Sequence, residues 1–111
     1  MVAPVFYDKN VSVLPPIVID SGASGPLVLK AGVAGLTSKL YRLILLCGGT
    51  TFIIFKDGTT ELTGPFSFTT GGGMILDFQQ DPWFQTSPGN DFILYSSASV
   101  PVAGAAWIVQ S

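Results

Sequence analysis

Residues 39–47 read Lys-Leu-Tyr-Arg-Leu-Ile-Leu-Leu-Cys. This run contains neither glycine nor proline, and it predicts a β-strand bounded by turns. Since side chains alternate along a strand, one face carries Leu40, Arg42, Ile44 and Leu46, and the other carries Tyr41, Leu43, Leu45 and Cys47. Both faces are mostly apolar. We therefore expect a strand that is buried on both sides, inside a sandwich or between the sheet and another subunit.

Similar short apolar runs occupy the chain on both sides of this strand. The sequence has 13 glycines and 8 prolines that separate them, which is typical of short strands joined by turns. The Asp57-Gly58 pair predicts a hairpin, because glycine readily adopts the positive φ that such a turn needs. These patterns predict an all-β protein, an antiparallel β-sandwich or jelly-roll-like fold with about eight strands, formed by residues 26–111 as a single domain.

Residues 1–25 differ from the rest of the chain. Pro4, Pro15, Pro16 and the Ser21–Gly25 segment surround two short apolar pieces. Because proline fixes the backbone and removes a hydrogen-bond donor, these residues are expected to form an extended N-terminal arm or an edge strand. An arm could pack on a neighbouring subunit, whereas an edge strand would belong to the same sandwich.

Charge is scarce, with only 12 charged side chains among 111 residues and a net charge of −2. Soluble domains are about one quarter charged, and monomers rarely expose large apolar patches. We therefore expect much of the surface to be covered by copies of the chain or by a larger assembly. The five basic residues are scattered, so no nucleic-acid partner is expected.

Targeting signals are also missing from the sequence. No window contains the roughly 18 apolar residues that a membrane span requires, so no membrane partner is expected. The first 20 residues have neither the basic start nor the apolar run of a signal peptide. Synthesis in a cytoplasm without export is the resulting expectation.

Catalytic chemistry finds little support in the composition. The chain has no histidine, the commonest general base and metal ligand near neutral pH. Cys47 is the single cysteine and lies in an apolar run, so we interpret it as a small buried hydrophobic residue. Most of the carboxylates neighbour turn residues. The sequence thus predicts no enzyme, no catalytic residues, no cofactor and no metal site.

Aromatic residues suggest a second class of function. Trp83, Phe84, Tyr95 and Trp107 could form a platform that stacks sugar rings, although aromatic residues at alternating strand positions are more often part of a core. A carbohydrate-binding module is the function that such a platform would support.

From Lys39 onward the chain resembles a group of small virion structural proteins of tailed bacteriophages. The resemblance covers about two thirds of the chain and lies in the order of its sequence elements. The elements are, in order, Lys39–Leu43, Phe52–Phe55, Asp57–Pro65, Gly71–Gly73, Pro82–Thr86, a turn with Gly89, and Phe92–Leu94.

The resemblance implies a sandwich similar to the cement or decoration proteins on the outer surface of icosahedral capsids. It implies the major capsid protein lattice as a partner, and self-association as a homotrimer, with a dimer as the alternative. It also implies location on the virion after synthesis in the host bacterial cytoplasm. Such a protein reinforces the shell through broad apolar contacts and needs no catalytic group. The alternative is a receptor-binding or carbohydrate-binding β-sandwich module of a phage tail fibre or tailspike, in which the aromatic platform would bind sugar.

Candidate interface residues follow from the two apolar regions described above. On the strand at 39–47, one face offers Leu40, Ile44 and Leu46. In the N-terminal region, the anchors are expected to be Val11, Val13, Ile17 and Ile19.

Overall fold

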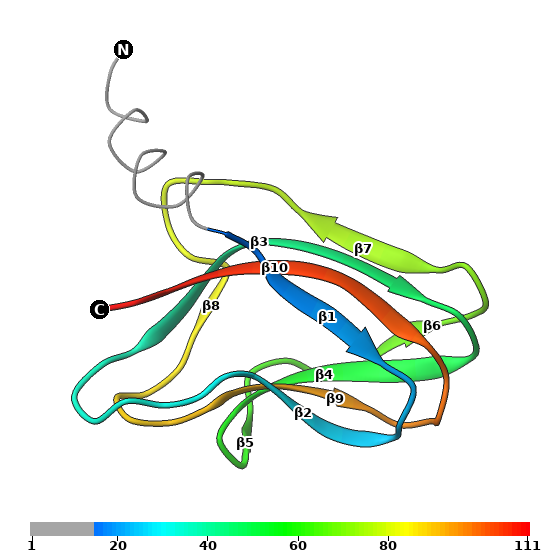
Figure 1. Ribbon diagram of the computed structural model, residues 1–111, viewed down its shortest axis with the longest axis horizontal. Helices are drawn as coiled ribbons and strands as arrows, with labels where there is room; N and C mark the ends of the chain where they lie inside the picture. Colours follow the sequence, from blue (N-terminus) through cyan, green and yellow to red (C-terminus); the bar gives the residue numbers. More distant parts are fainter. Residues whose placement is uncertain (1–14) are drawn as a thin grey trace.

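The computed structural model describes residues 15–111, which form ten β-strands and no helix. Two five-stranded antiparallel sheets pack face to face (Figure 1). The strands are β1 (Ile17–Ser21), β2 (Gly25–Lys30), β3 (Ser38–Cys47), β4 (Thr51–Asp57), β5 (Thr60–Glu61), β6 (Phe66–Phe68), β7 (Gly73–Leu76), β8 (Phe84–Gln85), β9 (Phe92–Ser96) and β10 (Val102–Gln110).

The strand pairs are nested along the chain. Strand β1 pairs with β10, β2 with β9, β3 with β7 and β8, and β4 with β5 and β6. The chain is therefore one long antiparallel ribbon rolled into two layers, which is a jelly roll. Sheet A has the order β1-β10-β3-β7 with β8 also on β3, and sheet B has the order β2-β9-β4-β5 with β6 also on β4. The predicted all-β antiparallel sandwich is confirmed.

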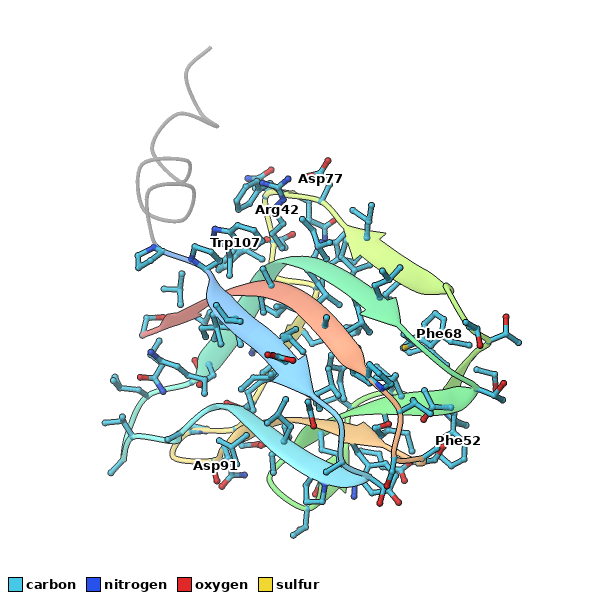
Figure 2. All side chains as sticks on the ribbon, turned by 45° about the vertical axis from the view of Figure 1, so that its right-hand side comes forward. Arg42, Phe52, Phe68, Asp77, Asp91 and Trp107 are labelled. Carbon is cyan, nitrogen blue, oxygen red and sulfur yellow. The ribbon has the colours of Figure 1, made fainter. Side chains whose placement is uncertain are left out.

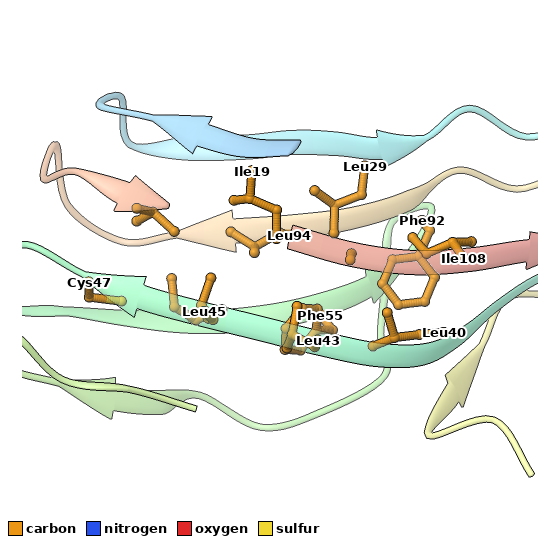
Figure 3. Close-up of a cluster of buried hydrophobic side chains, with 13 residues drawn as sticks. Ile19, Leu29, Leu40, Leu43, Leu45, Cys47, Phe55, Phe92, Leu94 and Ile108 are labelled. Carbon is orange, nitrogen blue, oxygen red and sulfur yellow. The ribbon is translucent and has the colours of Figure 1, made fainter. Parts of the chain in front are cut away.

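The core lies between the two sheets, where alternate side chains of each strand meet (Figure 3). Phe55 of β4 is fully buried and stacks on Phe84 at a centroid distance of 5.5 Å. Phe92 and Phe66 lie near the same ring, at 6.2 and 6.5 Å. Full burial of one such side chain contributes about 1.5–3 kcal/mol to folding. The residues that fill the core come from both sheets, which ties the layers together.

Strand β3 does not alternate regularly, and this corrects one sequence-based prediction. Trp107 pairs with Arg42, but the next residue, Ile108, pairs with Leu40, so Tyr41 is an extra residue on β3. Such a bulge reverses the alternation of the side chains on its two sides. Leu40 is fully buried in the core, so the prediction that it shares a face with Ile44 and Leu46 is wrong. Leu46 is 56% exposed, so β3 is not buried on both sides inside the sandwich, whereas burial of its outer face against another subunit stays a prediction.

The N-terminal predictions have two outcomes. Val11 and Val13 lie outside the described residues. Strand β1 is an edge strand of sheet A, in the antiparallel register that pairs Ile17 with Ala106. Ile19 is buried in the core, and Ile17 packs against that core while partly exposed. Ile19 is therefore a core residue rather than an exposed anchor for a neighbouring subunit.

The hairpin predicted at Asp57-Gly58 is present between β4 and β5. Gly58 has a φ of 61°, and the carboxylate of Asp57 accepts hydrogen bonds from the backbone N and Oγ of Ser87 at 3.0 and 2.8 Å. Asn90 donates a third at 2.9 Å. Burial alone raises the pKa of Asp57, but these hydrogen bonds outweigh it and leave the pKa below its usual value. This carboxylate fastens the hairpin to the loop that precedes β9.

Candidate docking face

The outer face of sheet A carries a row of apolar side chains from one edge of the sheet to the other. The strand registers align Val18 of β1 with Ala105 of β10, Ala105 with Ile44 of β3, and Ile44 with Ile75 of β7. Val18 is 74% exposed, Ile75 is 70% exposed and Ile44 is 36% exposed. Residues aligned in this way touch across a sheet, so the row is a continuous apolar strip facing solvent.

A second row lies beside the first and extends the apolar area. It aligns Ala103 with Leu46, and Leu46 with Gly73, while Asp20 stands at the β1 end of the same row. A shallow groove of about 500 Å³ follows β3 and β7 through both rows, and it is lined by Ile44, Leu45, Leu46, Gly73, Met74 and Ile75. We call the outer surface formed by these two rows and the Arg42 cluster described next the docking face.

Arg42 forms a cluster with two aromatic rings at the other end of the docking face. Its guanidinium lies 4.9 Å from the ring centroid of Trp107 and 5.2 Å from that of Phe78, and the two rings meet edge to face. Asp77 approaches Arg42 Nε to 3.6 Å (Figure 2). This distance is too long for a hydrogen bond, and the buried Nε has no hydrogen-bond partner among residues 15–111.

The positions of Asp77 and Phe78 depend on a closed loop after β7. The Nε1 of Trp83 donates to the backbone carbonyl of Asp77 at 2.7 Å. The backbone N of Trp83 donates to the carbonyl of Leu40 at 2.8 Å, which attaches the loop to β3. The guanidinium of Arg42 thus lies against one ring of β10 and one ring of this loop, with the carboxylate of Asp77 in ion-pair range.

Sheet B has a different outer face. The register aligns Val28 of β2 with Ile93, Ile93 with Lys56, and Lys56 with Glu61, so this row ends in two charged side chains. The Lys56 ammonium lies 5.1 Å from the ring centroid of Tyr95. This row of sheet B thus contains two charges, whereas the row from Val18 to Ile75 of sheet A contains none.

The structure places the predicted interface residues in different environments. Ile44 and Leu46 lie on the docking face, whereas Leu40 and Ile19 are core residues. The sequence reasoning missed the other members of the face, above all Val18, Ile75 and Trp107. For Val18 a signal was present, because an exposed position between Ile17 and Ile19 follows from the alternation of a one-sided strand. The position of Trp107 next to Arg42 could not be predicted without the pairing register between β10 and β3.

Three of the four aromatic residues expected to form a sugar-stacking platform lie in separate places, and the fourth, Trp83, is hydrogen-bonded to the loop after β7. Phe84 packs against the core and stacks on Phe55. Tyr95 belongs to sheet B, with Phe52 at a centroid distance of 6.5 Å. Trp107 lies on the outer face of sheet A. The sequence-based grouping of these rings into one platform is wrong.

Comparison with known proteins gives no relative: no protein-family model, curated protein or solved structure matches the chain. Within residues 15–111, no helix has the length and hydropathy of a membrane span.

Proposed function

We propose that this protein is a non-enzymatic structural subunit of a bacteriophage virion, a capsid cement or decoration protein that binds the outer surface of the major capsid protein lattice. The proposal combines the resemblance of the chain from Lys39 onward with the docking face of sheet A. The observation that carries it is the apolar row from Val18 through Ala105 and Ile44 to Ile75.

The row supports an assembly role because the removal of apolar side chains from water lowers the free energy. Burial of apolar surface contributes about 25 cal/mol per Å², and specific interfaces obtain most of their affinity from such buried surface at their centre. The docking face joins an apolar centre to an Arg–Trp cluster, and these two residue types are enriched where interface binding energy concentrates. It has the composition of an interface core.

Multivalency completes the proposed mechanism. Each subunit would bury its docking face against neighbouring protein, and many copies on one shell would act together. Resistance to the outward pressure of packaged DNA then arises from the sum of many contacts. No catalytic group is needed for this role, and the proposed location is the capsid surface, after synthesis in the host cytoplasm.

Co-sedimentation with expanded phage capsid shells tests the proposal. The wild-type protein should pellet with the shells and saturate at a fixed number of copies per shell. Leu46→Asp, which places a charge in the docking face, should reduce the bound amount at least about tenfold, since an unpaired buried charge is costly. Val28→Asp adds the same charge to an exposed valine of sheet B and is the matched control.

Two results would overturn the proposal. One is wild-type protein that stays in the supernatant at every concentration. The other is equal binding by wild type and Leu46→Asp. Specific binding of the free protein on a glycan array, unchanged by Leu46→Asp, would instead support the carbohydrate-binding alternative.

A further inference from the structure

The edge strands of the two sheets differ in how they are protected against pairing with another strand. Proteins usually protect such edges with proline, lysine, a bulge or very short strands. In sheet B, edge strand β2 contains Pro26, and its register is irregular between Val28 and Lys30. On the other side of sheet B, β5 and β6 have only two and three residues. The edge strands of sheet A, β1 and β7, contain no proline, no lysine and no irregular register.

On β7, the backbone groups of two residues point away from the sheet. The backbone N of Cys47 donates to the carbonyl of Gly72 at 2.7 Å, which makes these residues a hydrogen-bonded pair. Such pairs alternate with non-hydrogen-bonded pairs along an antiparallel ladder, so Met74 belongs to the next hydrogen-bonded pair. The N–H and C=O groups of Gly73 and Ile75 are therefore directed toward the free edge, where no strand of residues 15–111 pairs with them.

The same alternation applies to β1, at the opposite edge of sheet A. The backbone N of Gly48 donates to the carbonyl of Pro101 at 2.7 Å, as a hydrogen-bonded pair of the ladder between β3 and β10. The two alanines that β10 contributes to the docking face follow Pro101 by two and four positions, so their backbone groups also bond to β3. Val18 and Asp20 are aligned with these alanines. Their N–H and C=O groups are thus directed toward the free edge of β1.

The two free edges are complementary to each other. Strand β1 is antiparallel to β10, β10 to β3, and β3 to β7, so β1 and β7 run in opposite directions. When two copies stand side by side in the same orientation, β7 of one and β1 of the other therefore form an antiparallel pair. Alignment of Ile75 with Val18 also aligns Gly73 with Asp20. All four residues direct their backbone groups to the edge, so each N–H meets a C=O.

Side chains also match in this register. Val18 and Ile75 both lie on the outer face, so the apolar row of one copy would continue into the row of the next. On the inner face, Ile17 of one copy comes opposite Leu76 of the other. Both are partly buried apolar residues that pack against the core. The pairing would therefore cover apolar side chains on both faces of the sheet.

We propose that copies of this protein join edge to edge, with β7 of one copy paired with β1 of the next, so that sheet A continues from copy to copy. A contact between two different surfaces repeats from subunit to subunit, and it forms a ring where the rotation between subunits closes. The docking faces stay on one side of the joined sheet and remain free for the capsid lattice. This inference rests on the proposed function, because the shell is what holds the copies side by side.

The strength of this contact comes from the main chain. Strand addition binds short peptides mainly through main-chain hydrogen bonds, while side chains provide specificity. Here about four such bonds form over roughly 14 Å of strand, which is a weak interface between free molecules. A shell that already holds many copies raises their local concentration. We therefore expect the pairing on the shell, and in free solution only at high protein concentration.

Oxidative cross-linking of introduced cysteines tests the inference. The Cα atoms of a hydrogen-bonded antiparallel pair are about 5.5 Å apart, a distance that a disulfide spans. The variant Val18→Cys with Ile75→Cys, bound to expanded capsid shells, should therefore form a ladder of linked oligomers on oxidation. Val28→Cys with Ile75→Cys is the matched control, because Val28 is an exposed valine of sheet B. It should give at least about tenfold less product, since only cysteines within disulfide range are linked efficiently.

A proline at the edge tests the hydrogen bonds themselves. Ile75→Pro removes an N–H that faces away from the sheet, a position at which strands accept proline. Ile75→Thr changes the same side chain but keeps the N–H, and is the control. Without support from neighbouring copies, Ile75→Pro should need at least about fivefold more protein than Ile75→Thr to half-saturate the shells. Equal half-saturation by the two variants would count against the pairing.

The outcomes separate this inference from the proposed function. Shell-bound protein that forms no ladder, or forms it equally in the two cysteine variants, would overturn the edge pairing and leave the capsid role in place. If the protein does not bind shells, the same oxidation of concentrated free protein decides. A ladder specific to Val18→Cys with Ile75→Cys would then support the pairing although the capsid role fails, and its absence would overturn the pairing.

Discussion

Val18 and Ile75 lie on opposite edge strands of sheet A, yet the strand registers place them in one row through Ala105 and Ile44. They are also highly exposed for apolar residues, at 74% and 70%. Side chains that make few contacts within the monomer contribute little to its stability.

Substitution of these two residues should thus change the apolar surface of the protein while leaving its free energy of unfolding nearly unchanged. We expect Val18→Thr and Ile75→Thr to change the free energy of unfolding by less than about 0.5 kcal/mol each. They should at the same time lower the binding of an apolar fluorescent dye to the free protein. Urea unfolding and dye titration measure the two effects, and a loss of several kcal/mol would show that the row belongs to the core.

The bulge at Tyr41 gives a prediction that compares two leucines of the same strand. Leu40→Ala should destabilise the protein by about 2–5 kcal/mol, because it leaves a cavity in a packed core. Leu46→Ala should cost much less, since that side chain is more than half exposed. Chemical denaturation of both variants makes the comparison. Equal losses would contradict the register that places Leu40 opposite Ile108.

Much of the fold follows from local sequence, and the bulge shows where local sequence is insufficient. The run of residues 39–47 without glycine or proline and the Asp57-Gly58 turn predict elements that the structure contains. The face of Leu40 was predicted wrongly because the extra residue on β3 is defined by its pairing with β10, some 65 positions away. The docking face could not be predicted for the same reason. Its rows combine residues of four strands, and only the pairing registers of the whole sheet bring these residues together.

Gly104 provides a further prediction, because it lies against the backbone of β3. A Cβ at this position would clash with the backbone carbonyl oxygen of Ile44, and φ is 152°. Gly104→Ala should therefore destabilise the fold by at least about 1–3 kcal/mol, through clash and backbone strain. Gly22→Ala is the control, since nothing lies within 4 Å of its Cβ. Thermal unfolding should show a large shift for the first variant and little for the second.

Asp57 makes the stability of the protein depend on pH. Its pKa is lowered in the folded state, so it contributes stability above the pKa of the unfolded chain, and this contribution disappears as pH falls through the folded pKa. Asp57→Asn replaces an acceptor by an amide donor facing Ser87, and it should cost about 1–3 kcal/mol at pH 7. The difference from wild type should shrink in acid.

Urea unfolding at several pH values between neutral and strongly acidic measures this effect. Asp81→Asn changes the charge of an exposed carboxylate and is the control. A constant difference between wild type and Asp57→Asn across the whole pH range would argue against the ionised carboxylate as the source of the stability.

The central claim is that the outer face of sheet A is an assembly interface, and hydrogen exchange of the protein bound to expanded capsid shells tests it most directly. The account predicts that backbone amides of β1 and β7, the edge strands of sheet A, gain protection from exchange on binding. Those of β2 and β5 in sheet B should not change. Protection confined to sheet B, or no change in either sheet while the protein is bound, would contradict it.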